Sequence, residues 1–367
     1  MKYYLIAGEA SGDLHGANLM KALKKQDNDT QFRFFGGDLM QEQGGTLVKH
    51  YKDMAFMGFV EVLLNLSTVL KNISFCKQDV FSYKPDVLIL IDFPGFNLKI
   101  ADFAKKNNIK VFYYISPKVW AWNQKRVLKI KKVVDRMFCI FPFEVDFYKK
   151  WGMDVDYVGN PLLDAIHDFK ENPDFRASHQ LEGKKIVALL PGSRKQELNY
   201  LLPTMISVVD QFPKYQFVIA GAPNFSKDDY ETYMQGRNLP VVFGETYDLL
   251  SNSEAAIVTS GTATLETALF KIPEVVVYKG NPISIGIAKL LVKIGFISLV
   301  NLIVNREIVK ELIQEDCNTQ KLGEELSKIL SGTGREQMLA DYEELMEKMG
   351  KPGASEKTAQ LMIKYLS

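Results

Sequence analysis

The stretch Leu189-Leu-Pro-Gly-Ser-Arg-Lys-Gln-Glu197 marks the point where an apolar run stops and a polar helical pattern begins. Residues 186–190 have the length and the β-branched content of a buried strand, and Ser193 stands where a helix N-cap is expected. The stretch therefore predicts a strand, a short loop and a helix, which is the repeating unit of α/β folds.

The same loop has the residues of an anion site. Backbone N–H groups are left free at a helix start, and Gly192 lets a ligand approach the backbone closely. Arg194 adds a planar guanidinium that is always charged. We therefore predict that Gly192, Ser193 and Arg194 contact phosphate oxygens, although an ordinary strand-to-helix turn explains this loop equally well when it is taken alone.

Length and composition restrict the class of protein. A chain of 367 residues suits two domains, and 47% hydrophobic with 24% charged residues is typical of a soluble globular protein. A net charge of +1 argues against nucleic acid as a partner. Cys76, Cys139 and Cys317 lie far apart, with neither a disulfide framework nor a metal-ligand spacing, which favours a reducing cytosol. Residues 1–8 turn polar at Glu9, so we expect a first strand there and not a signal peptide.

The first strand, residues 3–7, runs into the loop Gly8-Glu-Ala-Ser-Gly-Asp13 and then a helical pattern. No GxG pair occurs in this loop, so a nicotinamide enzyme is disfavoured. Ser11, Gly12 and Asp13 are predicted to bind a sugar or a phosphate, with a purely structural turn as the alternative.

Residues 85–91 form a strong apolar strand, and Asp92 follows at its carboxyl end. Ligands of open α/β sheets gather outside these strand ends. A charged residue directly after an apolar strand is also costly to bury without a partner. We therefore predict that Asp92 is a catalytic carboxylate, and the alternative is a cap on the next helix.

Two stretches suggest contact with lipid. Residues 54–66, which include Met57, are apolar on nearly every helical face, as in a core helix or in a helix that meets an acyl chain. Trp120 and Trp122 precede a dense basic run, and this combination suits the headgroup layer of an anionic membrane. A solvated helix face is the alternative for the run, whose members are Lys125, Arg126, Lys129, Lys131 and Lys132.

Composition turns polar around residues 168–183, where we place the boundary between domains. The prediction is an N-terminal Rossmann-like domain over residues 1–167 and a second one over residues 168–345, with strand ends facing each other across a cleft. A last helix within residues 346–367 is expected to pack back on the body.

The second half repeats the strand-to-helix logic at Thr259-Ser-Gly-Thr-Ala-Thr-Leu-Glu266. Small residues there permit close approach of a ligand, and a carboxylate one turn into the helix can accept both hydroxyls of a ribose. A capped helix start is the alternative for this turn alone, but two such turns in one half-chain favour a nucleotide diphosphate. The residues predicted to bind it, besides the first loop, are Ser260, Gly261, Thr262, Ala263 and Glu266.

Residues 283–304 form the longest apolar stretch, but Lys289 and Lys293 make a transmembrane helix costly. We expect a packed or interfacial helix that breaks near Gly295. A strand over residues 297–300, closed by Asn301, and a helix over residues 306–313 are expected to follow.

Taken together, these motifs resemble those of the lipid-A-disaccharide synthase family. The match runs in the family's order from the first strand to about Cys317. Its parts are Gly8-Glu-Ala-Ser-Gly-Asp13, Ile91-Asp-Phe-Pro-Gly-Phe-Asn97, Ser116-Pro-Lys-Val-Trp-Ala-Trp122, Leu190-Pro-Gly-Ser-Arg194, Ser260-Gly-Thr-Ala263 with Glu266, and Asn301 with Arg306-Glu-Ile-Val-Lys-Glu-Leu312.

The resemblance implies an inverting glycosyltransferase of the two-domain GT-B type that needs no metal or cofactor. It would join UDP-2,3-diacylglucosamine to 2,3-diacylglucosamine 1-phosphate and release UDP. On the family pattern Asp92 is the general base, Arg194 and Asn301 are active-site residues, and the second domain binds UDP. Gly95 departs from the pattern, because the family often has an acidic residue at its position.

The resemblance also implies a cytoplasmic enzyme, peripheral on an anionic inner membrane, and leaves a homo-oligomer open. Ser11, Gly12, Asp13, Met57, Trp120 and Trp122 would then contact the acceptor or its lipid chains. Two alternatives remain: a UDP-N-acetylglucosamine 2-epimerase-like enzyme, which has no use for the apolar and basic stretches, and a non-catalytic lipid or nucleotide carrier, which needs no carboxylate at Asp92.

Overall fold

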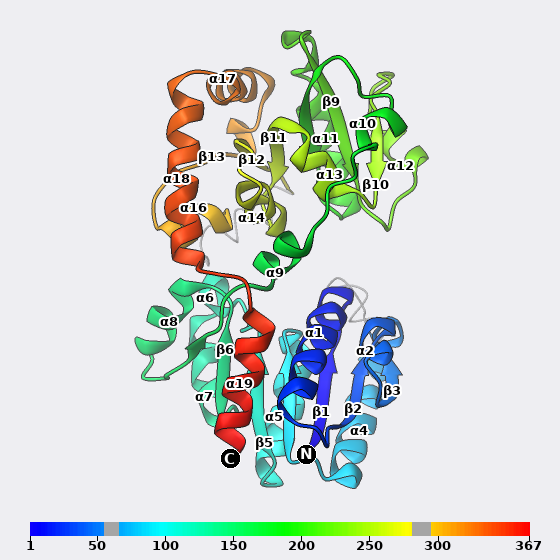
Figure 1. Ribbon diagram of the computed structural model, residues 1–367, viewed down its shortest axis with the longest axis vertical. Coiled ribbons are helices and arrows are strands. Elements are labelled where there is room, and N and C mark those ends of the chain that lie inside the picture. Colours follow the sequence, from blue (N-terminus) through cyan, green and yellow to red (C-terminus); the bar gives the residue numbers. More distant parts are fainter. Residues whose placement is uncertain (55–65, 281–294) are drawn as a thin grey trace. The chain divides into compact units, whose positions relative to one another are not determined.

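The computed structural model describes residues 1–54, 66–280 and 295–367. They form two compact units, drawn in Figure 1: unit 1 comprises Met1–Asp164 and Lys351–Ser367, and unit 2 comprises Ala165–Gly350. The chain thus passes from unit 1 to unit 2 between residues 164 and 165, whereas the boundary predicted from composition lies between residues 167 and 168.

Unit 1 is built on a seven-stranded sheet in the order β3-β2-β1-β4-β5-β6-β7, with every neighbouring pair parallel. Its strands are β1 (Lys2–Ala7), β2 (Gln31–Gly36), β3 (Thr46–His50), β4 (Val87–Ile91), β5 (Lys110–Tyr114), β6 (Arg136–Cys139) and β7 (Asp156–Tyr157). Its helices are α1 (Ala10–Gln26), α2 (Asp38–Glu42), α4 (Leu66–Tyr83), α5 (Pro94–Lys106), α6 (Val119–Trp122), α7 (Val127–Val133), α8 (Pro142–Lys149) and α19 (Ala354–Leu366), and α9 (Pro161–Asp168) leads into unit 2.

Side chains that alternate along the strands of unit 1 fill two separate cores. Tyr3 and Leu5 of β1 point into the core beneath α1 and α19, whereas Tyr4 and Ile6 point into the core beneath α4, α5 and α7. Both faces of the sheet are therefore covered, which is why its strands read as continuous apolar runs. Figure 1 shows α1 and α19 side by side on one face, although they come from opposite ends of the chain.

Unit 2 has a six-stranded parallel sheet in the order β10-β9-β8-β11-β12-β13. Its strands are β8 (Lys185–Leu190), β9 (Tyr215–Gly221), β10 (Val241–Phe243), β11 (Ser253–Thr259), β12 (Glu274–Tyr278) and β13 (Lys310–Ile313). Its helices are α10 (Phe175–Ser178), α11 (Lys195–Ile206), α12 (Lys227–Glu231), α13 (Thr246–Ser251), α14 (Thr262–Leu269), α16 (Leu299–Val304), α17 (Thr319–Leu330) and α18 (Thr333–Met349).

Both sheets follow the same path. The first strand of each unit lies in the middle, the next two add on one side, and the chain then crosses back to the other side of the first strand. The order therefore reverses between β1 and β4 in unit 1 and between β8 and β11 in unit 2. Ligands of doubly wound sheets bind outside the carboxyl ends of the strands at such a reversal point. The predicted fold class, two Rossmann-like α/β domains, is confirmed.

Two predicted elements are wrong. The strand predicted over residues 297–300 overlaps the start of the helix α16. The N-cap residue of this helix is Ser298, whose hydroxyl accepts a hydrogen bond from the Asn301 N–H. The helix predicted over residues 306–313 contains instead the strand β13, which pairs with β12 from Val275 to Tyr278. Short apolar runs fit either period, and here the free edge of β12 decides that the second segment pairs as a strand.

Candidate active site

The loop that follows β8 has the geometry of an anion site. Gly192 has a φ of 99°, and a Cβ there would lie 2.3 Å from Glu197 Oε2, so only glycine fits. Behind it the helix α11 begins, with Arg194 at its N-cap. The Arg194 side chain is 81% exposed. The loop therefore presents a charged guanidinium next to a glycine turn.

A carboxylate of the chain itself already binds the N–H groups of this loop. Glu197 Oε2 accepts from the Ser193 N–H at 2.9 Å and from the Arg194 N–H at 3.1 Å. Its Oε1 accepts from Arg194 Nη1 at 3.1 Å. The donors that were predicted to bind phosphate thus bind an internal anion, which shows what kind of group their geometry accepts.

The second predicted turn of unit 2 lies between β11 and α14. Gly261 and Thr262 are exposed, Ala263 is half-buried, and the Ser260 hydroxyl donates to the Ile297 carbonyl at 2.9 Å. Glu266 Oε1 accepts from the Tyr247 hydroxyl at 2.9 Å, and burial raises the pKa of Glu266. Together with the loop after β8, this turn occupies the reversal point of unit 2.

Asp92 occupies the reversal point of unit 1, directly after β4. Its φ is 42° and that of Phe93 is 48°, a left-handed conformation that costs about 1–3 kcal/mol per residue outside glycine. Three hydrogen bonds hold the turn: the Asp92 N–H donates to the Tyr114 carbonyl at 3.1 Å, and the Asp92 carbonyl accepts from the Tyr113 hydroxyl at 2.5 Å and from Asn97 Nδ2 at 2.7 Å. These bonds fix the backbone of the turn at the end of β4.

The environment of Asp92 shifts its acid–base behaviour. Burial raises the pKa of the carboxyl to about 6, the nearby Lys118 ammonium lowers it, the Glu9 carboxylate raises it, and a hydrogen bond from the Phe93 N–H lowers it. A carboxyl that titrates close to neutral pH is suited to accept a proton from a substrate hydroxyl.

Ser11, Gly12 and Asp13 begin α1 beside this site. The Asp13 carboxylate is buried and accepts from the N–H groups of Gly37, Leu39 and Met40 at 2.7, 3.1 and 3.1 Å. These bonds satisfy the start of α2. Asp13 therefore has the structural role that was the alternative to ligand binding. The side chain of Ser11 is exposed.

Trp120 does not face solvent, so the prediction of a surface tryptophan at this position is wrong. Its side chain is 7% exposed, its indole N–H donates to Glu144 Oε1 at 3.3 Å, and its ring packs edge-on against Phe143. The partner that draws it inward is distant in the sequence, so the local pattern could not reveal it. Met57, the side chain of Trp122 and most of the predicted apolar helix lie outside the described residues.

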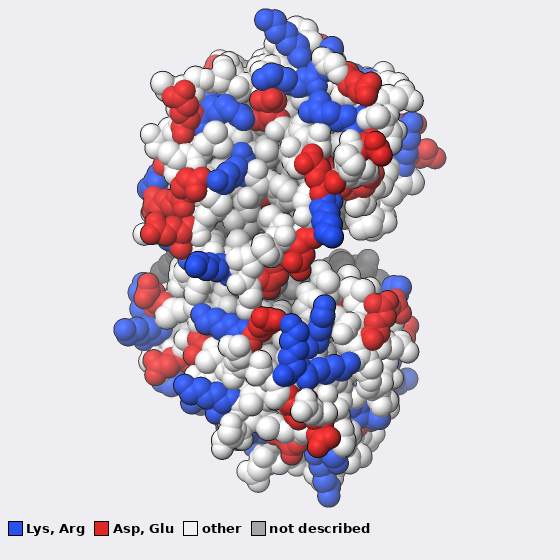
Figure 2. Space-filling view, viewed as in Figure 1, with Lys and Arg blue, Asp and Glu red and all other residues white. Residues whose placement is uncertain are grey.

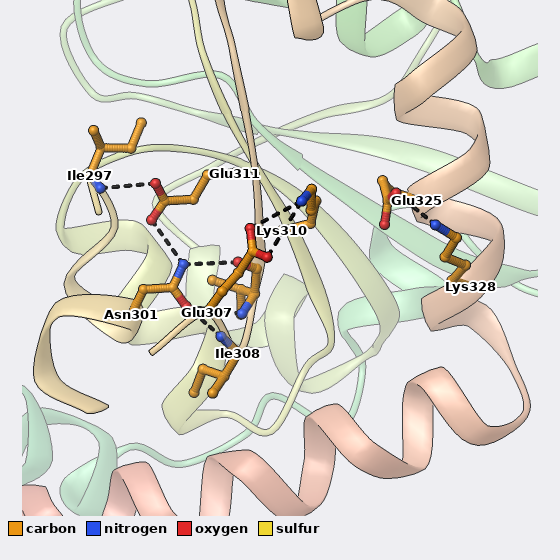
Figure 3. Close-up of polar contacts among 9 residues, drawn as sticks. Ile297, Asn301, Glu307, Ile308, Lys310, Glu311, Glu325 and Lys328 are labelled. Atoms are coloured by element: carbon orange, nitrogen blue, oxygen red, sulfur yellow. Dashed lines mark hydrogen bonds and ion pairs between the residues drawn. The ribbon is translucent and has the colours of Figure 1, made fainter. Parts of the chain in front are cut away.

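Asn301 is fully buried and uses its whole hydrogen-bonding capacity within unit 2. Its Nδ2 donates to the Val309 carbonyl and to Glu311 Oε1, both at 2.9 Å, and its Oδ1 accepts from the N–H groups of Ile308 and Val309 at 2.7 and 3.0 Å. Figure 3 shows this amide between Glu311 and Ile308. An amide makes at most four such bonds, so Asn301 has none left for a ligand and instead fixes the segment that leads from α16 into β13.

Glu144 is a residue that the sequence did not single out. It is 1% exposed and accepts from the Ser116 hydroxyl, from Trp120 Nε1 and from the Phe141 N–H. Burial raises the pKa of its carboxyl to about 7. Its position three residues into a helix that follows a strand was the only sequence signal.

Charge is mixed over the surface. Figure 2 shows Lys and Arg interspersed with Asp and Glu on the visible face of each unit, as a net charge of +1 leads one to expect. The basic run of unit 1 is locally dense, with Lys125, Lys129 and Lys132 exposed around Leu128, which is itself 52% exposed. Within the described ranges, no helix combines the length and the apolar character needed to cross a bilayer.

The solved structures that resemble this chain share its fold. A Staphylococcus aureus MnaA–UDP co-structure superposes with a TM-score of 0.68 at 14% identity, covering 100% of this chain and 96% of that one. The glycotransferase of kitacinnamycin superposes with a TM-score of 0.67 at 13% identity, covering 100% and 99%. At these identities the likeness concerns the fold, which is that of GT-B enzymes.

Comparison with known sequences is more specific than comparison of folds. The family model described as lipid-A-disaccharide synthetase matches residues 3–365. The lipid-A-disaccharide synthase of Geobacter sulfurreducens is 36% identical over 370 residues, covering 99% of this chain and 96% of that protein. The one from Pseudomonas putida strain F1 is 40% identical over 332 residues, covering 89% and 88%. With both sheets and the loops at their reversal points in place, the chain belongs to the lipid-A-disaccharide synthase family of glycosyltransferases, which act on lipid A precursors.

Proposed function

We propose that the chain condenses UDP-2,3-diacylglucosamine with 2,3-diacylglucosamine 1-phosphate, forming lipid A disaccharide 1-phosphate and UDP. The observation that supports this best is Asp92, a half-buried carboxyl at the reversal point of unit 1 with a pKa raised to about 6. A carrier protein has no need for such a group.

Asp92 acts as the general base. As the acceptor hydroxyl attacks the anomeric carbon of the donor, its proton passes to the Asp92 carboxylate and the bond between that carbon and the diphosphate breaks, with inversion. The strained backbone at Asp92 and Phe93 fixes the carboxylate in place before the substrate arrives, so the transition state needs little reorganisation.

Unit 2 binds the UDP part of the donor. The diphosphate takes the place of the Glu197 carboxylate at the Ser193 and Arg194 N–H groups, and Arg194 neutralises the charge that develops on the leaving group. Glu266 accepts the ribose hydroxyls, with Tyr247 orienting it. These donors neutralise the diphosphate without a metal.

The exposed basic face of unit 1 attaches the enzyme to the cytoplasmic surface of an anionic inner membrane. Lys125, Leu128, Lys129 and Lys132 recur at helical spacing, so the lysines meet anionic headgroups while the leucine meets the acyl boundary. Both substrates carry acyl chains and reside in that membrane.

The assay that tests the proposal uses the purified protein with UDP-2,3-diacylglucosamine and the diacylglucosamine 1-phosphate acceptor. We expect a disaccharide product and one UDP for each bond formed. The structural likeness to UDP-N-acetylglucosamine 2-epimerases supplies the competing reaction, so the same protein is also given UDP-N-acetylglucosamine. Epimerisation of that sugar with no disaccharide from the lipid pair would overturn the proposal.

A further inference from the structure

The carboxyl of Glu144 is buried in the interior of unit 1, close to the carboxyl ends of β5 and β6. Three donors surround it: the Ser116 hydroxyl, the indole N–H of Trp120 at 3.3 Å and the Phe141 N–H at 3.1 Å. Removing a carboxylate from water is costly, and three charge-assisted hydrogen bonds are what offset that cost here.

Two of these donors belong to the loop over residues 116–122. Ser116 lies just after β5 and Trp120 lies in α6, so Glu144 binds the beginning and the later part of one short loop. Gln124 Nε2 adds a bond to the Trp120 carbonyl at 3.2 Å. The loop is therefore fixed at two points, and Lys118 stands between them with an exposed side chain.

Lys118 is the cation whose charge acts on the Asp92 carboxyl. The other groups that act on the Asp92 carboxyl are the Glu9 carboxylate from the loop after β1 and the Phe93 N–H from its own turn, while the Tyr113 hydroxyl binds the Asp92 carbonyl. Among these groups Lys118 is the one whose loop depends on Glu144.

We propose that Glu144 is a positioning residue of the transferase: by binding both ends of the 116–122 loop it holds Lys118 near Asp92 and so sets the pH range in which Asp92 accepts a proton. This inference rests on the proposed role of Asp92 as the general base. The titratable groups near Glu144 itself are Cys139, Tyr148 and Tyr157, all with pKa values raised by burial, so they stay neutral in the pH range of interest.

The consequence has a definite sign. A nearby cation favours the ionised carboxylate and lowers its pKa. If the loop relaxes and Lys118 moves away, the pKa of Asp92 rises. The acidic limb of the pH–activity profile then moves to higher pH, because Asp92 becomes protonated earlier as the medium is acidified. A displacement of a partly exposed charge by a few ångströms corresponds to a shift of about half to one pH unit.

The experiment measures kcat/KM of the full chain between pH 5 and pH 8.5 in the disaccharide assay. The variants are Glu144→Gln, Lys118→Met and the double variant, with Asp92→Asn to identify the limb that belongs to the base. Each single variant is expected to move the acidic limb upward by about half to one pH unit, and the double variant is expected to move it no further than the larger single effect, because both act through one charge.

A Glu144→Gln enzyme with reduced activity but the acidic limb of the wild type would overturn the inference, since a merely structural role lowers activity at every pH alike. Loss of the acidic limb altogether in this variant would also overturn the inference, because Glu144 would then be the titrating group.

Should Glu144→Gln not fold, Ser116→Ala removes one of the two hydrogen bonds that hold the loop and leaves the Glu144 carboxyl in place. It must give a smaller shift in the same direction, and an unmoved limb refutes the inference. If instead Asp92→Asn retains the activity and the limb of the wild type, the proposed base itself is wrong, which is a different and recognisable outcome.

Discussion

The two reversal points of this molecule have the same topology and opposite chemistry. At the point between β1 and β4 the chain places the half-buried carboxyl of Asp92, and two strands further, after β6, it places the buried carboxyl of Glu144. At the point between β8 and β11 it places exposed N–H groups and the Arg194 guanidinium. One site is suited to take up a proton and the other to hold an anion.

This difference shows what the repeated fold contributes. The sheet supplies only a position, an edge where loops from two neighbouring strands converge, and each loop then supplies its own groups. Glu197 illustrates the point, since the donors of unit 2 hold a carboxylate from their own helix, whereas at Asp92 the effect of burial outweighs the stabilising charge of Lys118 and leaves the pKa raised. Substitutions at one site at a time test whether the two sites differ in this way.

The largest effect is expected from Asp92→Asn. The amide keeps the size of the side chain but cannot accept the proton of the acceptor hydroxyl, so kcat should fall by roughly 10²- to 10⁴-fold. UDP affinity, measured by calorimetry, should stay within about twofold, because the change lies in unit 1. An Asp92→Asn enzyme with the kcat of the wild type would remove the distinction between the two sites.

Arg194→Ala should act on the opposite side. Losing a charge-assisted contact to the diphosphate weakens UDP binding by roughly 10- to 100-fold. The acidic limb of the pH profile should not move, because Asp92 is untouched. Addition of EDTA should leave the wild-type rate unchanged, and a rate abolished by EDTA and restored by magnesium would refute the metal-free part of the proposal. Unaltered UDP affinity in Arg194→Ala would exclude this loop as the diphosphate site.

Charge reversal on the basic face tests whether unit 1 also carries the membrane contact. Changing Lys125, Lys129 and Lys132 to Glu should lower binding to anionic vesicles by about tenfold or more, and salt should weaken the binding of the wild type because the attraction is screened. Activity on vesicle-presented substrate should fall while activity in detergent is spared.

The matched control for this test reverses Lys21, Lys84 and Lys99, three exposed lysines elsewhere in unit 1, so both variants have the same net charge. An equal loss of vesicle binding in the control would mean that overall charge, and not this face, governs attachment. An equal loss of activity in vesicles and in detergent would assign the cluster to folding or to substrate contact.

The smallest effect concerns a buried carboxyl that lies outside both sites. Glu274 in β12 is fully buried, and neither of its side-chain oxygens has a hydrogen-bond partner among the described residues. Burial raises its pKa well above the usual value near 4.5. The folded protein therefore favours the protonated form, and this contribution to stability is present below pH 4.5 and is lost as the pH rises through the folded-state pKa.

Glu274→Gln removes this titration without changing the shape of the side chain. The variant should unfold roughly 2–4 °C above the wild type at pH 8, and the difference should shrink towards pH 5. Thermal unfolding at the two pH values measures it. A difference that is independent of pH would show that Glu274 does not titrate in this range, and kcat should be unchanged because Glu274 lies away from the loops of the reversal points.

Local pattern was sufficient for much of this protein. The apolar runs that end at Ala7, Ile91, Leu190 and Val258 predicted four buried strands, and the glycine or aspartate within three residues of each run predicted the loops at both reversal points. These features can be read from the sequence because a strand buried on both faces must be apolar throughout, and a loop at its end must supply turn residues within a few positions.

The tertiary structure alone decided which side chains meet. Trp120 points inward because its indole N–H donates to Glu144. The side-chain amide of Asn301 donates to the Val309 carbonyl and to Glu311. The segment at Lys310 becomes a strand because β12 offers a free edge. In each case the deciding partner comes from another element, and no pattern of hydrophobicity within one segment encodes the hydrogen bond that a distant segment will provide.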